Sequence, residues 1–348
     1  MVELKDYTYG IDRVEERQIV IYGAGILGKL IYKKLVSKGV DNIFFCDWYK
    51  AGERLFGKEV LHPSALLEKK DSIDVILTII GNGFFDAAKI LVNIGIPFFV
   101  ARKLVNDIKL FEIEDMNLKK EISACKHQYK STLKKYYLYH NIVSNRELLA
   151  TDITVNSAEK LEDFHQMTLV VTDRCTLKCE KCSAFTYRYV HPQDVPYEKM
   201  MKDFSRCLEC IDYLNTLVIV GGETLLYKDL VTLLYACENN PRIVRVFIPT
   251  NGTVLPGEEL LKAMAECNVQ VMISSYNVSQ NRGRELELLL LNHGIEVIYR
   301  QDEFWSDLAD CSYKEYSEEE VKNIFTTCQG RTCWNFKNGI LSPCIMEP

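Results

Sequence analysis

Three cysteines stand within eight residues, directly after a short apolar segment. Residues 168–172 (TLVVT) have the composition of a buried strand, and Cys175, Cys179 and Cys182 lie in the loop that follows. Three thiolates this close together indicate a metal centre. A [4Fe–4S] cluster normally takes four cysteines, so a cluster held here by three would keep one iron open. A structural zinc site, which uses four protein ligands, is the alternative.

Length and composition restrict what surrounds this loop. A chain of 348 residues predicts two or three domains. The net charge of −6 argues against a general nucleic-acid binder, because binding phosphates requires a basic surface. No run of 18 apolar residues predicts a membrane span, and the charged N-terminus lacks a signal peptide. Of the 13 cysteines, only Cys46 and Cys125 precede the loop, so metal binding in a cytoplasmic protein is favoured over disulfides.

The N-terminal part has a strand–turn–helix pattern. Residues 18–22 form an apolar strand, and Gly23, Gly25 and Gly28 follow it at the start of a helix. A second strand at 43–46 ends in Asp47. Such glycines let the backbone approach a pyrophosphate, and the acid can bind a ribose diol. The pattern predicts a Rossmann-like parallel sheet over residues 1–105. In the alternative, the glycines only pack helix against strand.

The same stretch resembles the small N-terminal domain of sugar-modifying acyltransferases. The resemblance is carried by Asp47, residues 57–60 (GKEV) and Pro63. It implies a pocket for a nucleotide-sugar, while the glycine pattern alone would also suit NAD. Residues 106–165 are charged and aromatic and predict a helical connector with no chemistry of its own.

After the cysteine loop, strands and helices alternate, and each strand ends in a distinctive motif. The strand at 216–220 ends in Gly221, Gly222 and Glu223, the strand at 244–249 leads to Asn251, and the strand at 269–273 leads to Ser274 and Ser275. A parallel α/β barrel has its active site at the carboxyl ends of its strands. The sequence therefore predicts a partial barrel over residues 166–305 with one site at that edge.

This motif set resembles the radical S-adenosylmethionine (SAM) superfamily. The resemblance implies a partial (β/α)6 barrel in which the three cysteines hold a [4Fe–4S] cluster and SAM binds the open iron. It also implies that Glu223 receives the SAM ammonium group. Gly221, Gly222 and Asn251 would line the SAM site, and Ser274, or else Ser275, would contact the ribose.

The C-terminal region, residues 306–348, contains a second group of cysteines. Asn338-Gly339 predicts a hairpin between strands at 334–337 and 340–342, which would bring Cys333 and Cys344 together near Cys328. This arrangement resembles the SPASM and twitch regions of radical SAM enzymes, and implies an auxiliary [4Fe–4S] cluster. Cys311, 17 residues upstream of Cys328, is a candidate for its fourth ligand. Zinc with the same ligands is the alternative. The short distance from Cys344 to the end suggests a truncated chain or incomplete protein ligation.

Together these features predict an α/β enzyme that cleaves SAM reductively to a 5′-deoxyadenosyl radical. The radical would abstract hydrogen from a small sugar or nucleotide-linked substrate, in a dehydrogenation, dehydration or epimerisation. A flavodoxin- or ferredoxin-type protein would supply the electron. Two other hypotheses are a SPASM-type peptide-modifying maturase and a non-catalytic nucleotide- or redox-sensing protein.

Overall fold

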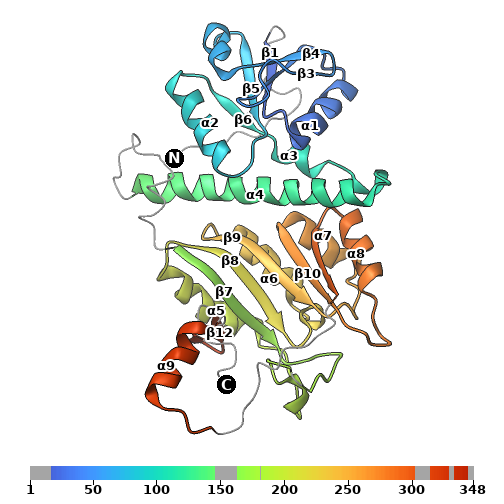
Figure 1. The fold of residues 1–348 in the computed structure, drawn as a ribbon, viewed down its shortest axis with the longest axis vertical. Coiled ribbons are helices and arrows are strands. Elements are labelled where there is room, and N and C mark those ends of the chain that lie inside the picture. Colours follow the sequence, from blue (N-terminus) through green and yellow to red (C-terminus); the bar gives the residue numbers. More distant parts are fainter. Residues whose placement is uncertain (1–16, 146–162, 181, 302–313, 329–332, 344–348) are drawn as a thin grey trace. The chain divides into compact units, whose positions relative to one another are not determined.

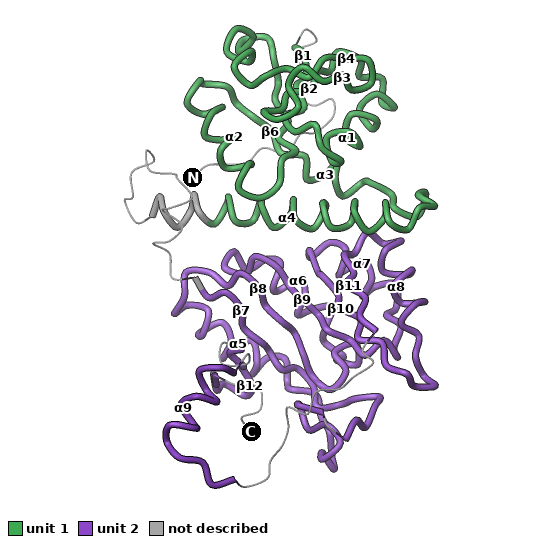
Figure 2. The backbone as a smooth tube through the Cα atoms, in the orientation of Figure 1, with its two compact units in different colours: residues 1–160 green, residues 161–348 purple. Residues whose placement is uncertain are grey.

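The structure is a computed structural model that describes residues 17–145, 163–180, 182–301, 314–328 and 333–343. The chain divides into two compact units, residues 1–160 and 161–348 (Figure 2). Each unit is built on a mainly parallel sheet with helices, so the predicted α/β fold class is confirmed (Figure 1). No helix in the described part of the chain is long and apolar enough to cross a membrane.

Unit 1 contains a six-stranded sheet in the order β3-β4-β2-β1-β5-β6. The strands are β1 (Gln18–Tyr22), β2 (Ile43–Cys46), β3 (Arg54–Leu55), β4 (Lys58–Leu61), β5 (Ile73–Leu77) and β6 (Phe98–Val100). All neighbours pair in parallel except β3 with β4. Because helices cover both faces of a doubly wound sheet, its strands are buried on both sides. Ile19, Val20 and Ile21 are accordingly all fully buried.

The helices of unit 1 contribute residues to the same buried core. They are α1 (Ile26–Ser37), α2 (Asn82–Asn93), the short α3 (Arg102–Asn106) and the long α4 (Met116–Asn145), and a 3₁₀ segment spans Pro63–Lys69. The sequence predicts the segment of α4 as part of a separate connector. Tyr129, Leu133 and Tyr136 of α4 instead belong to the buried core of unit 1. Because charged residues alternate with apolar residues along α4, the sequence pattern does not indicate this buried face.

Tyr129 anchors α4 to the sheet. Its hydroxyl donates to the carbonyl oxygen of Leu77 at 2.6 Å and accepts from the N–H of Ala101 at 2.9 Å. Replacing Tyr129 with phenylalanine leaves both buried backbone groups without this partner. We expect Tyr129→Phe to lower the free energy of unfolding by about 1–3 kcal/mol, measured by urea denaturation. Tyr137→Phe removes an exposed hydroxyl from the same helix and should have little effect; equal effects of the two substitutions would contradict this role.

Unit 2 contains a seven-stranded sheet in the order β11-β10-β9-β8-β7-β12-β13. Its consecutive strands are β7 (Asp163–Thr172), β8 (Tyr213–Gly221), β9 (Ile243–Thr250), β10 (Val269–Ser275) and β11 (Glu296–Gln301). The crossover helices are α5 (Tyr197–Glu209), α6 (Leu230–Asn239), α7 (Glu258–Glu266) and α8 (Gly283–Asn292). Since consecutive parallel strands are neighbours and such crossovers are right-handed, the four helices cover one face of the sheet.

The strands of unit 2 have an apolar face and a more polar face. In β10, Val269, Val271 and Ile273 are buried with residues of the crossover helices, whereas Gln270, Met272 and Ser274 on the other face are half-buried. The described part of unit 2 is an open sheet rather than a closed barrel. It has five consecutive parallel strands, and a sixth parallel strand, β12, comes from the C-terminal region.

The C-terminal region contains helix α9 (Glu318–Thr327) and the predicted hairpin, formed by β12 (Trp334–Lys337) and β13 (Ile340–Ser342). Asn338 and Gly339 have φ values of 52° and 83°, as the two central residues of a type I′ turn require. β12 also pairs in parallel with β7, the strand that leads into the cysteine loop. Phe336 of β12 packs on Phe204 of α5, with 5.5 Å between ring centroids.

Candidate radical SAM site

The cysteine loop is tied to the end of β8 by backbone hydrogen bonds. The N–H of Gly222 donates to the carbonyl oxygen of Thr172 at 3.0 Å, and the N–H of Glu223 donates to that of Arg174 at 2.7 Å. The two acceptors lie three residues and one residue before the first cysteine. These bonds fix the start of the loop against the Gly-Gly-Glu motif at the carboxyl edge of the sheet.

This close approach explains the two glycines. A Cβ atom on Gly222 would lie 2.7 Å from the Cβ of Cys175, and a Cβ on Gly221 would lie 2.6 Å from the Cγ2 of Thr172. Real Cβ atoms do not come this close to other heavy atoms. Any larger side chain at either position would push the cysteine loop away from β8.

Gly222→Ala should therefore impair cluster assembly. We expect the iron content after anaerobic reconstitution to fall about tenfold, because the shifted Cys175 no longer meets the other thiolates. Gly257→Ala is the matched control, since a Cβ on Gly257 would meet nothing within 4 Å. Wild-type iron content in Gly222→Ala would show that the loop tolerates the shift.

The sulfur atoms of the loop accept hydrogen bonds. Cys175 Sγ accepts from the N–H of Leu177 at 3.4 Å and from the side-chain amide of Asn251 at 3.6 Å. Cys182 Sγ accepts from the hydroxyl of Thr186 at 3.5 Å. Burial raises the pKa of the Cys175 and Cys179 thiols, with a contribution from neighbouring cysteines. Iron binding would favour the deprotonated thiolates despite the raised pKa, because a thiol that coordinates a metal loses its proton.

The donor set suits an iron–sulfur cluster. All three cysteines are half-buried, and hydrogen-bond donors face the sulfurs of Cys175 and Cys182; such bonds tune the potential of a cluster. Among the described residues, no group of three or more His, Cys, Asp or Glu side chains converges on a single ion. In a [4Fe–4S] cluster each cysteine binds a different iron, so the three thiolates of the loop do not need to meet at one ion.

Glu223 connects the ends of β8 and β9. It is 1% exposed, and its carboxylate accepts from the hydroxyl of Thr250 and the N–H of Asn251, both at 2.8 Å, and from the N–H of Leu225 at 3.0 Å. Burial raises the pKa of Glu223, and these hydrogen bonds oppose that increase. All three of these partners lie within the protein, so the role of Glu223 as acceptor of the SAM ammonium stays a prediction.

Asn251 extends this network to the cysteine loop. Its side-chain amide donates to the hydroxyl of Thr176 at 3.0 Å, and its carbonyl oxygen accepts from the N–H and hydroxyl of Thr253. The hydroxyls of Thr176 and Thr253 are 2.5 Å apart. The turn after β9 and the cysteine loop therefore form one hydrogen-bonded unit.

The structure distinguishes the two serines at the end of β10. Ser275 is 6% exposed, and its hydroxyl accepts from the side-chain amide of Asn281 at 2.7 Å. Ser274 is half-buried, on the opposite face from Val271 and Ile273, which pack against helices. Of the two serines, Ser274 is the better placed to contact a ligand at the polar face of the sheet.

Sequence reasoning missed the ion-pair partners of the two residues that directly precede the first cysteine. Lys337 of β12 forms an ion pair with Asp173, 3.0 Å between Nζ and Oδ1, and Arg174 forms one with Asp194 at 3.3 Å. The loop is thus linked to the C-terminal hairpin on one side. Asp173 and Arg174 stand beside the first cysteine in the sequence, but no sequence signal identifies their distant partners.

The predicted auxiliary site is described only in part. Cys328, at the end of α9, is exposed, and Cys333, just before β12, is half-buried. Cys311 and Cys344 lie outside the described residues. The hairpin register pairs Asn335 with Ser342, as the predicted approach of Cys333 to Cys344 requires. The ligand set itself stays a prediction.

In unit 1, Gly23, Gly25, Gly28 and Asp47 meet at the carboxyl edge of the sheet. Gly23 has a φ of 122°, and a Cβ on it would lie 2.6 Å from the Oγ1 of Thr78; Gly28 packs against Gly23. A Cβ on Gly25 would meet nothing within 4 Å, so packing does not explain this glycine. Asp47 accepts from the N–H of Ala24 at 2.8 Å.

Comparison with known proteins identifies the class of unit 2. Residues 169–292 match the family described as the radical SAM superfamily. For these residues, the resemblance to the radical SAM superfamily inferred from the motifs is confirmed. No curated protein matches the chain.

Solved structures with similarity to the chain include proteins with bound AdoMet. Histidine-tagged anSMEcpe with bound AdoMet is 17% identical over 39% of this chain and 42% of that one, with a TM-score of 0.33. BtrN in complex with AdoMet and 2-DOIA is 19% identical over 53% and 74%, with a TM-score of 0.37. SuiB of Streptococcus suis bound to S-adenosylmethionine is 18% identical over 57% and 49%, with a TM-score of 0.35. The chain thus covers less than half the length of anSMEcpe.

Proposed function

We propose that the chain is a radical SAM enzyme that generates a 5′-deoxyadenosyl radical and abstracts hydrogen from a sugar or nucleotide-linked metabolite. One observation carries the SAM part: the cysteine loop, Glu223 and Asn251 form a single hydrogen-bonded network at the carboxyl edge of the sheet. The cluster and SAM, once bound, would supply the electron transfer and the radical.

The protein's own residues have positioning roles in this proposal. Cys175, Cys179 and Cys182 would bind three irons and leave the fourth to SAM. Gly221 and Gly222 bring the backbone of β8 against the loop, and Ser274 would contact the SAM ribose. The hydrogen bonds between the loop and the end of β8 would hold the loop in place when SAM binds, which favours productive orientation.

Polar residues on the face of the sheet opposite the crossover helices support a hydroxyl-rich substrate. Parallel strands place residues in register, and Gln166, Thr216 and Arg245 stand side by side in the amino-terminal half of their strands, followed on the same face by Val218 and Phe247 nearer the carboxyl edge. Arg245 Nε donates to the hydroxyl of Thr216 at 2.8 Å, and Ser274 stands next to Arg300. A site with several fixed polar groups selects substrates through hydrogen bonds.

Deuterium transfer tests the substrate class. The reconstituted protein would be incubated with SAM, dithionite and sugars or nucleotide-sugars deuterated at carbon. The proposal predicts deuterium in 5′-deoxyadenosine with at least one of them. Transfer only from a deuterated peptide would favour a peptide-modifying maturase, and absence of SAM cleavage would favour a non-catalytic protein. We also expect a flavodoxin or a ferredoxin to support the reaction as electron donor in place of dithionite.

An auxiliary cluster near Cys328 and Cys333 would give the substrate radical an electron acceptor. The ion pair between Lys337 and Asp173 links the hairpin that follows these cysteines to the main loop. We expect the variant with Cys175, Cys179 and Cys182 all replaced by alanine to retain iron and sulfide in about equal amounts, because the second ligand set is intact. Zinc in place of iron would identify the alternative metal site, and loss of all metal would refute both.

A further inference from the structure

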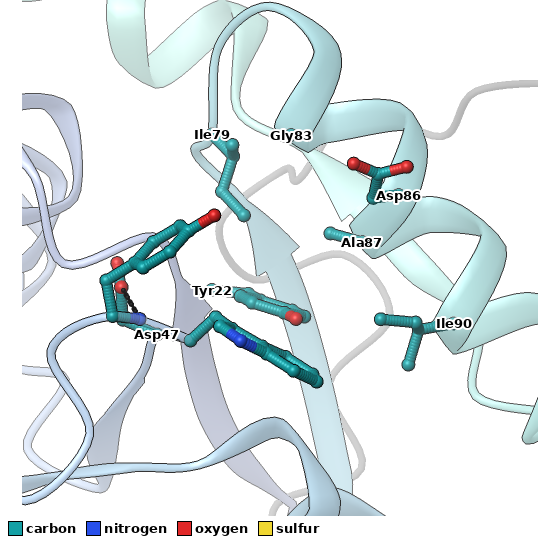
Figure 3. Close-up of a pocket in the computed structure, with 9 residues that line it drawn as sticks. Tyr22, Asp47, Ile79, Gly83, Asp86, Ala87 and Ile90 are labelled. Carbon is teal, nitrogen blue, oxygen red and sulfur yellow. Dashed lines mark hydrogen bonds between the residues drawn. The ribbon is translucent and has the colours of Figure 1, made fainter. Parts of the chain in front are cut away.

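A pocket of about 340 Å³ lies in unit 1 at the carboxyl edge of the sheet (Figure 3). It is formed by the ends of β1 and β2, the segment after β5 and one side of α2. In doubly wound sheets, ligands bind at this edge, where the strand order reverses. Here the reversal lies between β1 and β5, which flank the pocket.

The hydroxyl of Tyr22 has no assigned partner. Tyr22 is only 2% exposed and lines the pocket, and no described residue forms a hydrogen bond with its hydroxyl. Figure 3 shows its side chain between Asp47 and the residues of α2, Asp86 and Ile90. The hydroxyl is the part of this nearly buried side chain that reaches the pocket, where a ligand can form a hydrogen bond with it.

The pocket is acidic and aromatic. Asp47 and Asp86 line it together with Trp48 and Tyr49, and none of the described lining residues is basic. Burial raises the pKa of Tyr22, and the nearby Cys46, Asp47 and Asp86 raise it further. The exposed carboxylate of Asp86 forms no ion pair with the described residues.

Asp47 takes up a backbone donor of the adjoining glycine turn, while Lys50 Nζ donates to the carbonyl oxygen of Ala24 in the same turn at 3.5 Å. Asp47 Oδ2 accepts from the N–H of Ala24 at 2.8 Å, and its Oδ1 accepts from the N–H groups of Tyr49 and Lys50. A carboxylate has about four acceptor sites, so at most one is left for a ribose diol. Its negative charge also lies against a backbone N–H that would otherwise face a pyrophosphate.

We propose that this pocket binds the protonated amine of a small organic ligand rather than the phosphate of a nucleotide. The ammonium group would donate to the carboxylate of Asp86 and to the hydroxyl oxygen of Tyr22. Trp48 and Tyr49 supply aromatic faces for the cation or its carbon body. This pocket lies in unit 1 and the cysteine loop in unit 2, so the proposal stands whether or not the chain cleaves SAM. It differs from the NAD or nucleotide-sugar that the glycine turn predicts.

Fluorescence of Trp48 in the full-length protein tests this proposal. The ligands are glucosamine, putrescine and choline as amines, glucose as the neutral match of glucosamine, and uridine diphosphate as the phosphate-bearing probe. We expect at least one amine to change the emission, and glucose and uridine diphosphate to leave it unchanged. Trp48→Phe should remove the signal, which distinguishes it from Trp305 and Trp334.

Variants of the lining residues complete the test. Asp86→Asn should raise the apparent Kd for the amine at least about tenfold, because a hydrogen bond to a charged group is among the strongest single contacts. Tyr22→Phe should weaken binding less, and Asp71→Asn, an exposed control, should not change it. The proposal is overturned if no amine of the panel binds, if uridine diphosphate binds instead, or if Asp86→Asn binds the amine like the wild type.

Discussion

Cys179→Ala is expected to reduce the formation of 5′-deoxyadenosine from SAM at least about a hundredfold, because losing a direct ligand costs more than losing a group that supports one. Only two thiolates would remain in the loop, and an iron–sulfur cluster with an open iron needs three. The same loss is expected for Cys175→Ala and Cys182→Ala. The product would be measured by chromatography after anaerobic reconstitution and reduction with dithionite.

Cys210→Ala is the matched control for this experiment. Cys210 is exposed at the end of α5, and its Sγ donates a hydrogen bond to the carbonyl oxygen of Arg206 at 3.5 Å. This variant should form 5′-deoxyadenosine at the wild-type rate. Wild-type turnover in Cys179→Ala would show that the loop does not hold the catalytic cluster.

Glu223→Ala is expected to have the second-largest effect. It leaves the hydroxyl of Thr250 and the N–H groups of Asn251 and Leu225 without their buried carboxylate. We expect the free energy of unfolding to fall by about 3 kcal/mol, since hydrogen bonds to a charged group are each worth about 1.5–3 kcal/mol. SAM cleavage should fall about tenfold or more, because the turn that carries Asn251 loses its support.

Two further variants distinguish a role of Glu223 in supporting the turn after β9 from a role in binding SAM. Glu223→Gln keeps one acceptor oxygen but presents an amide to the N–H of Asn251, so it should destabilise the protein less than Glu223→Ala. Glu209→Ala removes an exposed carboxylate at the end of α5 and should be neutral. A variant of Glu223 that raises the KM for SAM with unchanged stability would contradict the supporting role and favour direct contact with the SAM ammonium.

Local sequence patterns predicted much of the fold correctly. The strands expected at 18–22, 43–46, 334–337 and 340–342 have the same bounds in the structure. Apolar strands bounded by glycines or Asn-Gly turns give strong local signals. The alternation of strand and helix predicted the parallel strands of unit 2, expected as a partial (β/α)6 barrel and found as an open sheet.

Long-range packing could not be predicted in this way. The buried face of α4 is hidden by lysines that alternate with Tyr129, Leu133 and Tyr136, so the pattern resembles a solvated connector. The parallel pairing of β12 with β7 joins segments more than 160 residues apart and depends on which edge of the sheet is free. No local propensity specifies that choice.

In the candidate site, too, local features could be predicted from the sequence and long-range contacts could not. The spacing of the cysteines and the glycines before Glu223 identified the loop and the strand end, because those residue types are required by chemistry and close backbone approach. The orientation of the Glu223 carboxylate towards Thr250 and Asn251 depends on how β8 and β9 lie side by side. The support of Asp173 by Lys337 likewise depends on the tertiary fold.

Electron paramagnetic resonance of the reduced protein, before and after addition of SAM, tests the central claim most directly. The account predicts a reduced [4Fe–4S] signal whose g values change when SAM binds the open iron. Both the signal and the change should be missing when Cys175, Cys179 and Cys182 are replaced together, apart from any signal of the auxiliary cluster. A reduced cluster in the loop whose spectrum is the same with and without SAM would contradict the account.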